Sequence, residues 1–105
     1  MTTSYTDLIG HISADMGQLR KEIPDTMRGV STMAQAATKE GALDAKTKEL
    51  IAAALSVAAR CEPCVGFHAQ ALVKLGASRA EMAETMAMAV YMGGGPSLMY
   101  AAKMS

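Results

Sequence analysis

The sequence contains no tryptophan, one phenylalanine and two cysteines, and its ten acidic residues balance its ten basic ones. A net charge of zero gives no electrostatic reason for binding to a phosphate backbone or an anionic membrane, so we expect neither nucleic acid nor membrane as a partner. Half of the residues are apolar, which predicts a folded chain. Because aromatic side chains are scarce, the core is expected to consist of small and flexible side chains, which suits closely packed helices.

Long apolar runs are also missing. The longest, LIAAALSVAA at residues 50–59, is far shorter than the roughly 20 residues that span a bilayer. The first ten residues, MTTSYTDLIG, lack the basic start and apolar stretch of a signal peptide. We therefore expect a cytoplasmic protein. In that reducing compartment, a lone cysteine pair is more often catalytic or metal-binding than structural.

Apolar residues recur at helical spacing through nearly the whole chain, and no strand-like alternation stands out. With 105 residues and no repeat or linker, the chain predicts a single all-α domain of about six helices over residues 1–105. Asp25 and Asp44 are expected to cap the second and third helices. The other boundaries are indicated by Pro24, Gly41, Pro63, Gly76, a Ser78–Glu81 capping box, the GGG run at 93–95 and Pro96.

The predicted third helix is apolar nearly all round after Glu49, so we expect it to be buried in the core or between subunits. The methionines at 82, 86, 88 and 92 indicate core filling or a subunit contact. One small core in so short a chain would leave apolar faces uncovered. We therefore expect a homo-oligomer.

Both cysteines fall within one segment, CEPCVGFH at residues 61–68. Pro63 favours the first turn of a helix, which places Cys61 at or just before the helix start and Cys64 inside the first turn. Their Cα atoms would then lie roughly 5–6 Å apart, within the range of a disulfide. The N–H groups and dipole of a helix N-terminus favour thiolate over thiol. His68 lies one turn after Cys64 on the same face, where it can take the thiol proton or stabilise the anion.

This segment has three possible interpretations: a redox dithiol, a metal site or two inert thiols. For zinc, Cys61, Cys64 and His68 supply three ligands where a closed site needs four, and His11 is isolated in the sequence. The redox interpretation is favoured, because one segment combines a dithiol, a polarising helix end and a base. The face shared with His68 favours Cys64 as the attacking thiolate, whereas greater exposure favours Cys61.

Glu49 is the only carboxylate between Asp44 and Glu62. Periodicity alone favours an ordinary first-turn acid beside two lysines in water. Glu49 precedes Cys61 by twelve residues, roughly 18 Å along a helix axis. A contact with His68 would therefore need a bent connection or a bridging water.

Residues 43–96 resemble the alkylhydroperoxidase D-like branch of the carboxymuconolactone decarboxylase family. The shared pattern is Glu, eleven residues, Cys-x-x-Cys, three residues and His, followed by a Gly-Ala-Ser helix start and a terminal glycine run. The resemblance implies an all-α fold, a homotrimer or homohexamer, and a cysteine pair that cycles between dithiol and disulfide. By position, it implies that Cys61 and Cys64 are the redox pair, that His68 is the base and that Glu49 joins a proton relay to His68, often through water.

The resemblance also implies an enzyme that reduces peroxides or disulfides, or that passes electrons from a lipoyl-type or other thiol donor to a peroxiredoxin, with no cofactor or bound metal. Two features differ from the peroxidase-linked members. Some of them carry a histidine where this chain has Pro63, and this chain corresponds to one repeat of the family module. The alternatives are a muconolactone decarboxylase, whose branch lacks the CxxC, and a helical assembly protein whose thiols sense redox state or bind metal.

Overall fold

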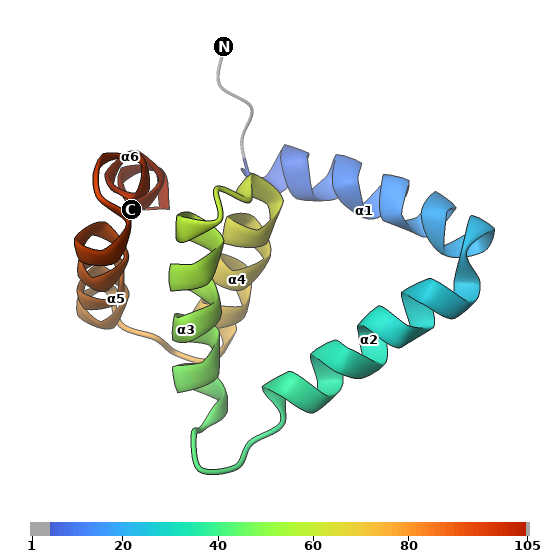
Figure 1. The fold of residues 1–105 in the computed structure, drawn as a ribbon, viewed down its shortest axis with the longest axis horizontal. Coiled ribbons are helices and arrows are strands. Elements are labelled where there is room, and N and C mark those ends of the chain that lie inside the picture. The colour runs from blue at the N-terminus through green and yellow to red at the C-terminus, as the bar shows by residue number, and fades with distance from the viewer. Residues whose placement is uncertain (1–4, 105) are drawn as a thin grey trace.

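The computed structural model describes residues 5–104, and this part of the chain forms helices without any strand (Figure 1). The six helices are α1 (Tyr5–Glu22), α2 (Pro24–Thr38), α3 (Ala45–Ala58), α4 (Glu62–Lys74), α5 (Arg79–Gly93) and α6 (Gly95–Met104). The predicted all-α class and helix number are confirmed. Residues 1–4 and 105 of the predicted domain lie outside the described residues.

Capping side chains fix the starts of α3 and α5 as the sequence predicts. The Asp44 carboxylate accepts a hydrogen bond from the Thr47 N–H at 2.7 Å. At the start of α5, the Ser78 hydroxyl accepts the Glu81 N–H at 3.0 Å, while the Glu81 carboxylate accepts the Ser78 N–H at 2.8 Å. These bonds satisfy N–H groups that have no partner within the helix.

The start of α2 differs from its prediction. The helix begins at Pro24, with Ile23 at the N-cap position and no side-chain cap. Asp25 lies one residue further on, in the first turn, and pairs with Arg28 on the next turn. Proline at the first helical position needs no partner for an N–H, and its fixed φ suits a helix, so the cap is dispensable here.

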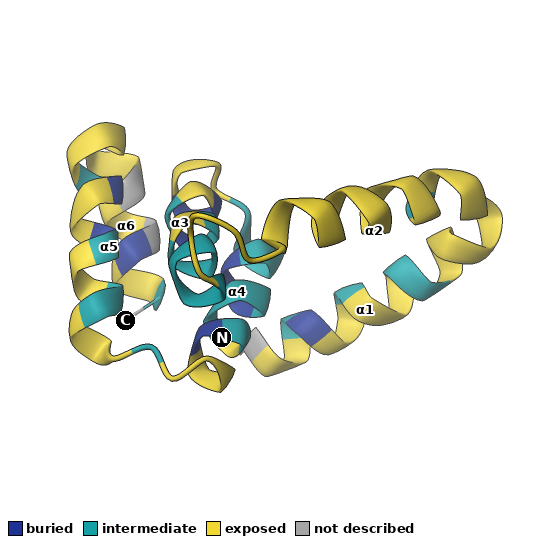
Figure 2. Ribbon diagram, turned by 90° about the horizontal axis from the view of Figure 1, so that it is seen from below, coloured by how far each residue is buried: buried dark blue, intermediate teal, exposed yellow. Residues whose placement is uncertain are grey.

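Helices α1 and α2 form an arm that extends away from the other four helices (Figure 1). The N-terminal part of α1 packs against α4 and buries Ile9. Further along α1, Leu19 is exposed, and α2 has no buried residue, as the burial colours in Figure 2 show. The apolar residues of α1 therefore become less covered along the helix, since Ile9 is buried, Met16 is half-buried and Leu19 is exposed.

The core lies among α3, α4, α5 and α6. Helices α3 and α4 form an antiparallel pair, and α5 packs on α3 and α6. The buried residues that pack together are mostly small, as the scarcity of aromatics predicts: Ala53, Val57, Val65, Leu72, Met86, Ala89 and Ala101.

Two parts of the apolar surface are left uncovered by their own chain. On α3, Ile51 is 44% exposed and Leu55 is 63% exposed, so this helix is not enclosed by its own chain. Of the four methionines on α5, Met86 is buried, whereas Met88 and Met92 face outward. Across residues 5–104, no helix is both long and apolar enough to cross a membrane.

Candidate functional site

A tight turn after α3 positions the cysteine pair. The Cys61 N–H donates to the Ser56 carbonyl at 3.0 Å, and the Arg60 N–H donates to the Val57 carbonyl at 3.1 Å. This is the Schellman pattern, which satisfies the last carbonyls of a helix. It requires a left-handed backbone conformation at the residue that directly follows the end of the helix. Arg60 occupies that position with φ 58°. The chain then reverses and begins α4 with Cys61 at its N-cap.

The two cysteines lie where the sequence predicts, at the start of α4. Their Cα atoms are 5.2 Å apart and their sulfurs are joined in a disulfide. The Cys64 N–H points at the Cys61 sulfur, with a nitrogen–sulfur distance of 3.3 Å. Pro63 lies in the first turn, as expected. Both cysteines are half-buried, so each sulfur is within reach of the surface and of the positive end of the helix dipole.

His68 and Glu49 are in direct contact. The Nδ1 atom of His68 lies 2.6 Å from the Oε2 atom of Glu49. The antiparallel arrangement of α3 and α4 brings the two residues together, so the contact needs no bridging water. The Glu49 side chain is 15% exposed and the His68 side chain 30% exposed, which partly shields the pair from solvent.

The hydrogen bond also determines which imidazole nitrogen is available for chemistry. An ionised carboxylate can only accept a hydrogen bond, so the bond to Glu49 places a proton on Nδ1 of His68. The Nε2 atom is then the nitrogen that can gain or lose a proton. Because His68 follows Cys64 by one turn on the same helix, the imidazole and the Cys64 side chain share a face of α4.

The sequence does not predict an ion pair that lies beside the cysteines. The Glu62 carboxylate, between Cys61 and Pro63, lies 2.7 Å from the Lys103 ammonium of α6. No local signal predicts this contact, because the two residues are 41 positions apart. The pair depends on how α6 returns to the start of α4.

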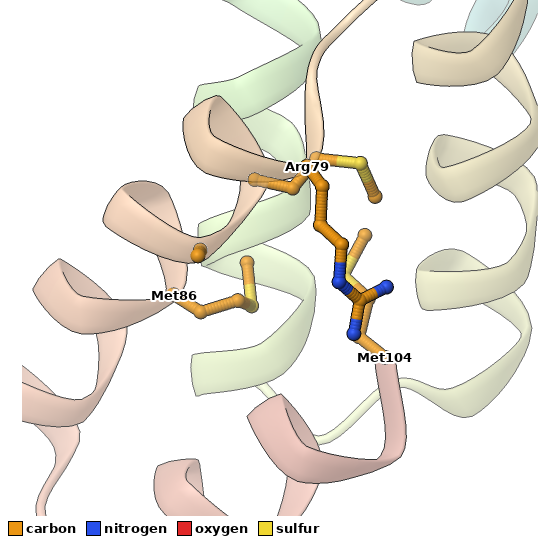
Figure 3. A pocket seen from close by; sticks show the side chains of 5 residues that line it. Arg79, Met86 and Met104 are labelled. Carbon is orange, nitrogen blue, oxygen red and sulfur yellow. The ribbon is translucent and has the colours of Figure 1, made fainter.

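Two hollows in the described surface are lined by other residues. A small cavity of about 60 Å³ lies where α5 meets the end of α6, lined by Arg79, Met82, Ala83, Met86 and Met104 (Figure 3). A larger apolar groove of about 360 Å³ lies between α3 and α5, lined by Thr47, Leu50, Ile51, Ala54, Leu55, Thr85 and Met88. Neither contains a cysteine or histidine.

The residues considered above as zinc ligands do not form a metal cluster. Within the described residues, no three His, Cys, Asp or Glu side chains are grouped so that they could hold a metal ion.

Together, the helical fold and the cysteine pair beside a His–Glu contact define an all-α protein with a candidate dithiol site. The chain belongs to the carboxymuconolactone decarboxylase family, whose family model matches residues 24–104. The match begins at the first residue of α2 and includes Glu49, Cys61, Cys64 and His68.

A solved structure agrees with this assignment, and two further proteins are similar in sequence. The crystal structure of an apo carboxymuconolactone decarboxylase family protein from Legionella pneumophila superposes with a TM-score of 0.93 and is 59% identical, covering 95% of this chain and 89% of its own. An uncharacterized protein of Cupriavidus necator is 40% identical over 98% of this chain and 91% of its own length. An uncharacterized protein of Haemophilus influenzae is 37% identical over 67% of this chain and 62% of its own length.

Proposed function

We propose that this protein is a thiol–disulfide oxidoreductase that reduces peroxides, or passes electrons from a thiol donor to a peroxiredoxin, through Cys61 and Cys64. The observation that carries the proposal is the placement of both cysteines at the N-terminus of α4, with His68 one turn away and held by Glu49. A helix N-terminus favours a thiolate, and the thiolate is the reactive form of cysteine. His68 supplies a base on the same helix face.

The reaction begins with the reduced pair. A thiolate attacks one oxygen of a peroxide ROOH, so that an S–O bond forms and the O–O bond breaks. The products are a cysteine sulfenic acid and an alkoxide, which takes a proton and leaves as ROH. The second thiol then attacks the sulfenic sulfur, and water leaves as the disulfide forms. The peroxide has gained two electrons, and the cysteine pair has lost two.

A dithiol donor returns the two electrons. One donor thiolate attacks a sulfur of the Cys61–Cys64 disulfide, and the mixed disulfide is resolved by the second donor thiol. Each attack releases a cysteine thiolate that needs either a proton or a stabilising neighbour. His68 can supply that proton from Nε2, and Glu49 holds the imidazole through Nδ1 in the orientation that this transfer needs.

The two cysteines have different surroundings, and these suggest a division of roles. The Cys61 sulfur is at the N-cap, where the Cys64 N–H points at it. Such a bond stabilises a thiolate at Cys61. Cys64 instead shares a helix face with His68. We retain Cys64 as the attacking residue because the base can remove its proton, with Cys61 as the resolving residue.

The test is peroxide consumption by the full-length protein with dihydrolipoamide, thioredoxin or glutathione as electron donor. We expect turnover with at least one donor, and its loss in both Cys61→Ser and Cys64→Ser. A third variant, Thr47→Ser at the other end of α3, is the matched control and should keep wild-type turnover. Absence of turnover with every donor, together with lactone decarboxylation that survives alkylation of both thiols, would identify a decarboxylase instead.

A further inference from the structure

The ion pair between Glu62 and Lys103 places a second pair of charges beside the cysteines. Glu62 is the first residue of α4 and directly follows Cys61. Lys103 lies in the last turn of α6 and is the only charged residue of that helix. We propose that Lys103 is a positioning residue for the thiol chemistry: by binding Glu62, it neutralises the carboxylate that would otherwise oppose thiolate formation at Cys61 and Cys64. This inference rests on the proposed function.

Glu62 has two opposite effects at this position. A carboxylate in the first turn stabilises a helix through the helix dipole. The same negative charge repels a thiolate on either neighbouring cysteine, because like charges disfavour each other's ionised form. Lys103 weakens this repulsion because it places a positive charge against the same carboxylate. The nitrogen–oxygen distance of 2.7 Å allows a charge-assisted hydrogen bond.

The size of the effect is limited by solvent. Both side chains are 41% exposed, and exposed ion pairs are screened by water and salt. Couplings between such groups correspond to about a two- to fivefold change in an equilibrium. We therefore expect the alkylation rate of the thiols to change about two- to fivefold, which is less than a buried charge would cause.

The other charged groups near the two cysteines are the same in the wild type and in variants at Glu62 or Lys103. Arg60 precedes Cys61 in the turn, and His68 contacts Glu49 across α3 and α4. The first two turns of α1, which packs on α4, carry Asp7 and His11. Variants at Glu62 and Lys103 leave these side chains unchanged, and the double variant separates the effect of the ion pair from that of any other contact of Lys103.

The same charge balance affects the redox equilibrium. Reduction by dithiothreitol breaks the Cys61–Cys64 bond and transfers two electrons, giving the protein dithiol and cyclic oxidised dithiothreitol. Groups that stabilise the thiolate favour the reduced protein. Loss of Lys103 should therefore shift this equilibrium toward the disulfide, whereas loss of the Glu62 charge should shift it toward the dithiol.

The experiment compares Lys103→Gln, Glu62→Gln, the double variant and Lys103→Arg in the full chain. The readouts are the rate of iodoacetamide alkylation of the reduced protein at neutral pH and the equilibrium with dithiothreitol. Lys103→Gln should slow alkylation about two- to fivefold and shift the equilibrium toward the disulfide by a similar factor. Lys103→Arg should behave as wild type. Glu62→Gln should react at least as fast as wild type, and it should suppress the defect of Lys103→Gln in the double variant.

A matched control is Lys74→Gln, which removes an exposed lysine from the far end of α4 and should change neither readout. The proposal is overturned if Lys103→Gln is alkylated at the wild-type rate. It is also overturned if the slower alkylation of Lys103→Gln persists in full in the double variant with Glu62→Gln, because Lys103 would then act only through the packing of α6. If Lys103→Gln does not fold, Glu62→Gln alone decides, and a slower rate contradicts the proposal. These readouts need no peroxide, so they are independent of whether the wild type turns over peroxide.

Discussion

His68 Nδ1 lies 2.6 Å from Glu49 Oε2, although the two residues are 19 positions apart and belong to different helices. The contact exists because α3 and α4 run antiparallel around a short turn that also carries Cys61. One local arrangement thus positions the thiols, the imidazole and the carboxylate. The imidazole is held by its Nδ1 atom, which leaves Nε2 for the proton exchange that we propose with Cys64.

Removal of His68 should affect Cys64 more than Cys61. In single-cysteine variants, His68→Ala is expected to slow alkylation at neutral pH mainly where Cys64 remains, because the base shares its helix face. The deficit should shrink at high pH, where a thiol ionises without assistance. In the two-cysteine protein, peroxide turnover should fall about a hundredfold, as for loss of a general acid–base group. Alkylation rate measured against pH for each single-cysteine variant checks this.

Glu49→Gln should act in the same direction but more weakly, because it alters the orientation and tautomer of His68 while the base itself remains. Both variants should retain their helical circular dichroism, since both positions are at least partly exposed. If the Cys64 profile is the same with and without His68, the proposed proton relay is wrong.

Replacing Arg60 by glycine should stabilise the folded protein. The turn after α4 uses the same hydrogen-bond pattern as the turn after α3, but with Gly76 at φ 74° where the first turn has Arg60 at φ 58°. A left-handed backbone is strained for residues that carry a Cβ atom. We expect Arg60→Gly to raise the free energy of unfolding by about 0.5–1 kcal/mol, after allowing for the greater freedom of glycine in the unfolded chain.

The reverse substitution is a matched control for this effect. Outside Gly76 and its two chain neighbours, no heavy atom lies within 4 Å of a Cβ built at Gly76, so Gly76→Arg introduces backbone strain without a clash at that Cβ. It should lower the free energy of unfolding by a similar amount. Urea unfolding of the two variants measures both changes. A destabilised Arg60→Gly would show that the arginine side chain contributes more than its backbone strain removes.

The ion pair between Lys46 and Glu81 predicts loss of stability in acid. The hydrogen bond from Lys46, followed by that from the Ser78 N–H, lowers the pKa of Glu81 below its ordinary value of 4.5. A carboxyl whose pKa is lower in the folded state stabilises the fold above its unfolded value and loses that contribution as the pH falls through its folded value. The Glu81 hydrogen bond likewise raises the pKa of Lys46 above 10.5, so the contribution of Lys46 persists until the pH rises beyond that value.

The measurement is the urea midpoint of wild type and Glu81→Gln as a function of pH. Wild type should be the more stable near neutral pH, and the difference should narrow below pH 4.5. Because both side chains are at the surface, added salt should reduce the difference at neutral pH. A difference that is the same in acid and at neutral pH would show that Glu81 acts as a neutral cap and not as a charge.

We propose that the protein assembles as a homotrimer or homohexamer. The groove between α3 and α5 is apolar, and Leu55 and Met88 at its edge are exposed. The arm, helix α2 above all, presents further apolar side chains that its own chain does not cover. Surfaces of this kind typically mark subunit contacts. Light scattering at micromolar concentration should give a mass of three or six chains, and Leu55→Glu should reduce it. A wild-type monomer at that concentration contradicts the proposal.

The parts of the fold that depend on nearby residues could be predicted from the sequence. Asp44, the Ser78–Glu81 box and Pro63 act within one helical turn, and each lies at the helix start that it indicates. The placement of Cys61 and Cys64 follows from the same local rule. Asp25 is the exception, because Pro24 can begin a helix without a side-chain cap.

Contacts that depend on the path of the chain could not be predicted in this way. Distance along a helix axis left a bent connection and a bridging water as alternatives for a contact between Glu49 and His68, and the tight turn at Arg60 provides the first by folding α4 back onto α3. That turn lacks the glycine that commonly marks a helix end, so its sharpness has no sequence signal. The pairing of Glu62 with Lys103 depends on α6, which is distant in the sequence.

The most direct test of the central claim is the mass of the reduced protein after treatment with one equivalent of peroxide. Trypsin releases both cysteines in one peptide, residues 61–74, because Arg60 precedes Cys61 and the next lysine or arginine is Lys74. We predict that this peptide loses two hydrogen atoms, as an internal disulfide requires, and that Cys61→Ser and Cys64→Ser do not show this loss. A persistent sulfenic acid without the disulfide, or an unchanged peptide mass, would contradict the claim that Cys61 and Cys64 act together in peroxide reduction.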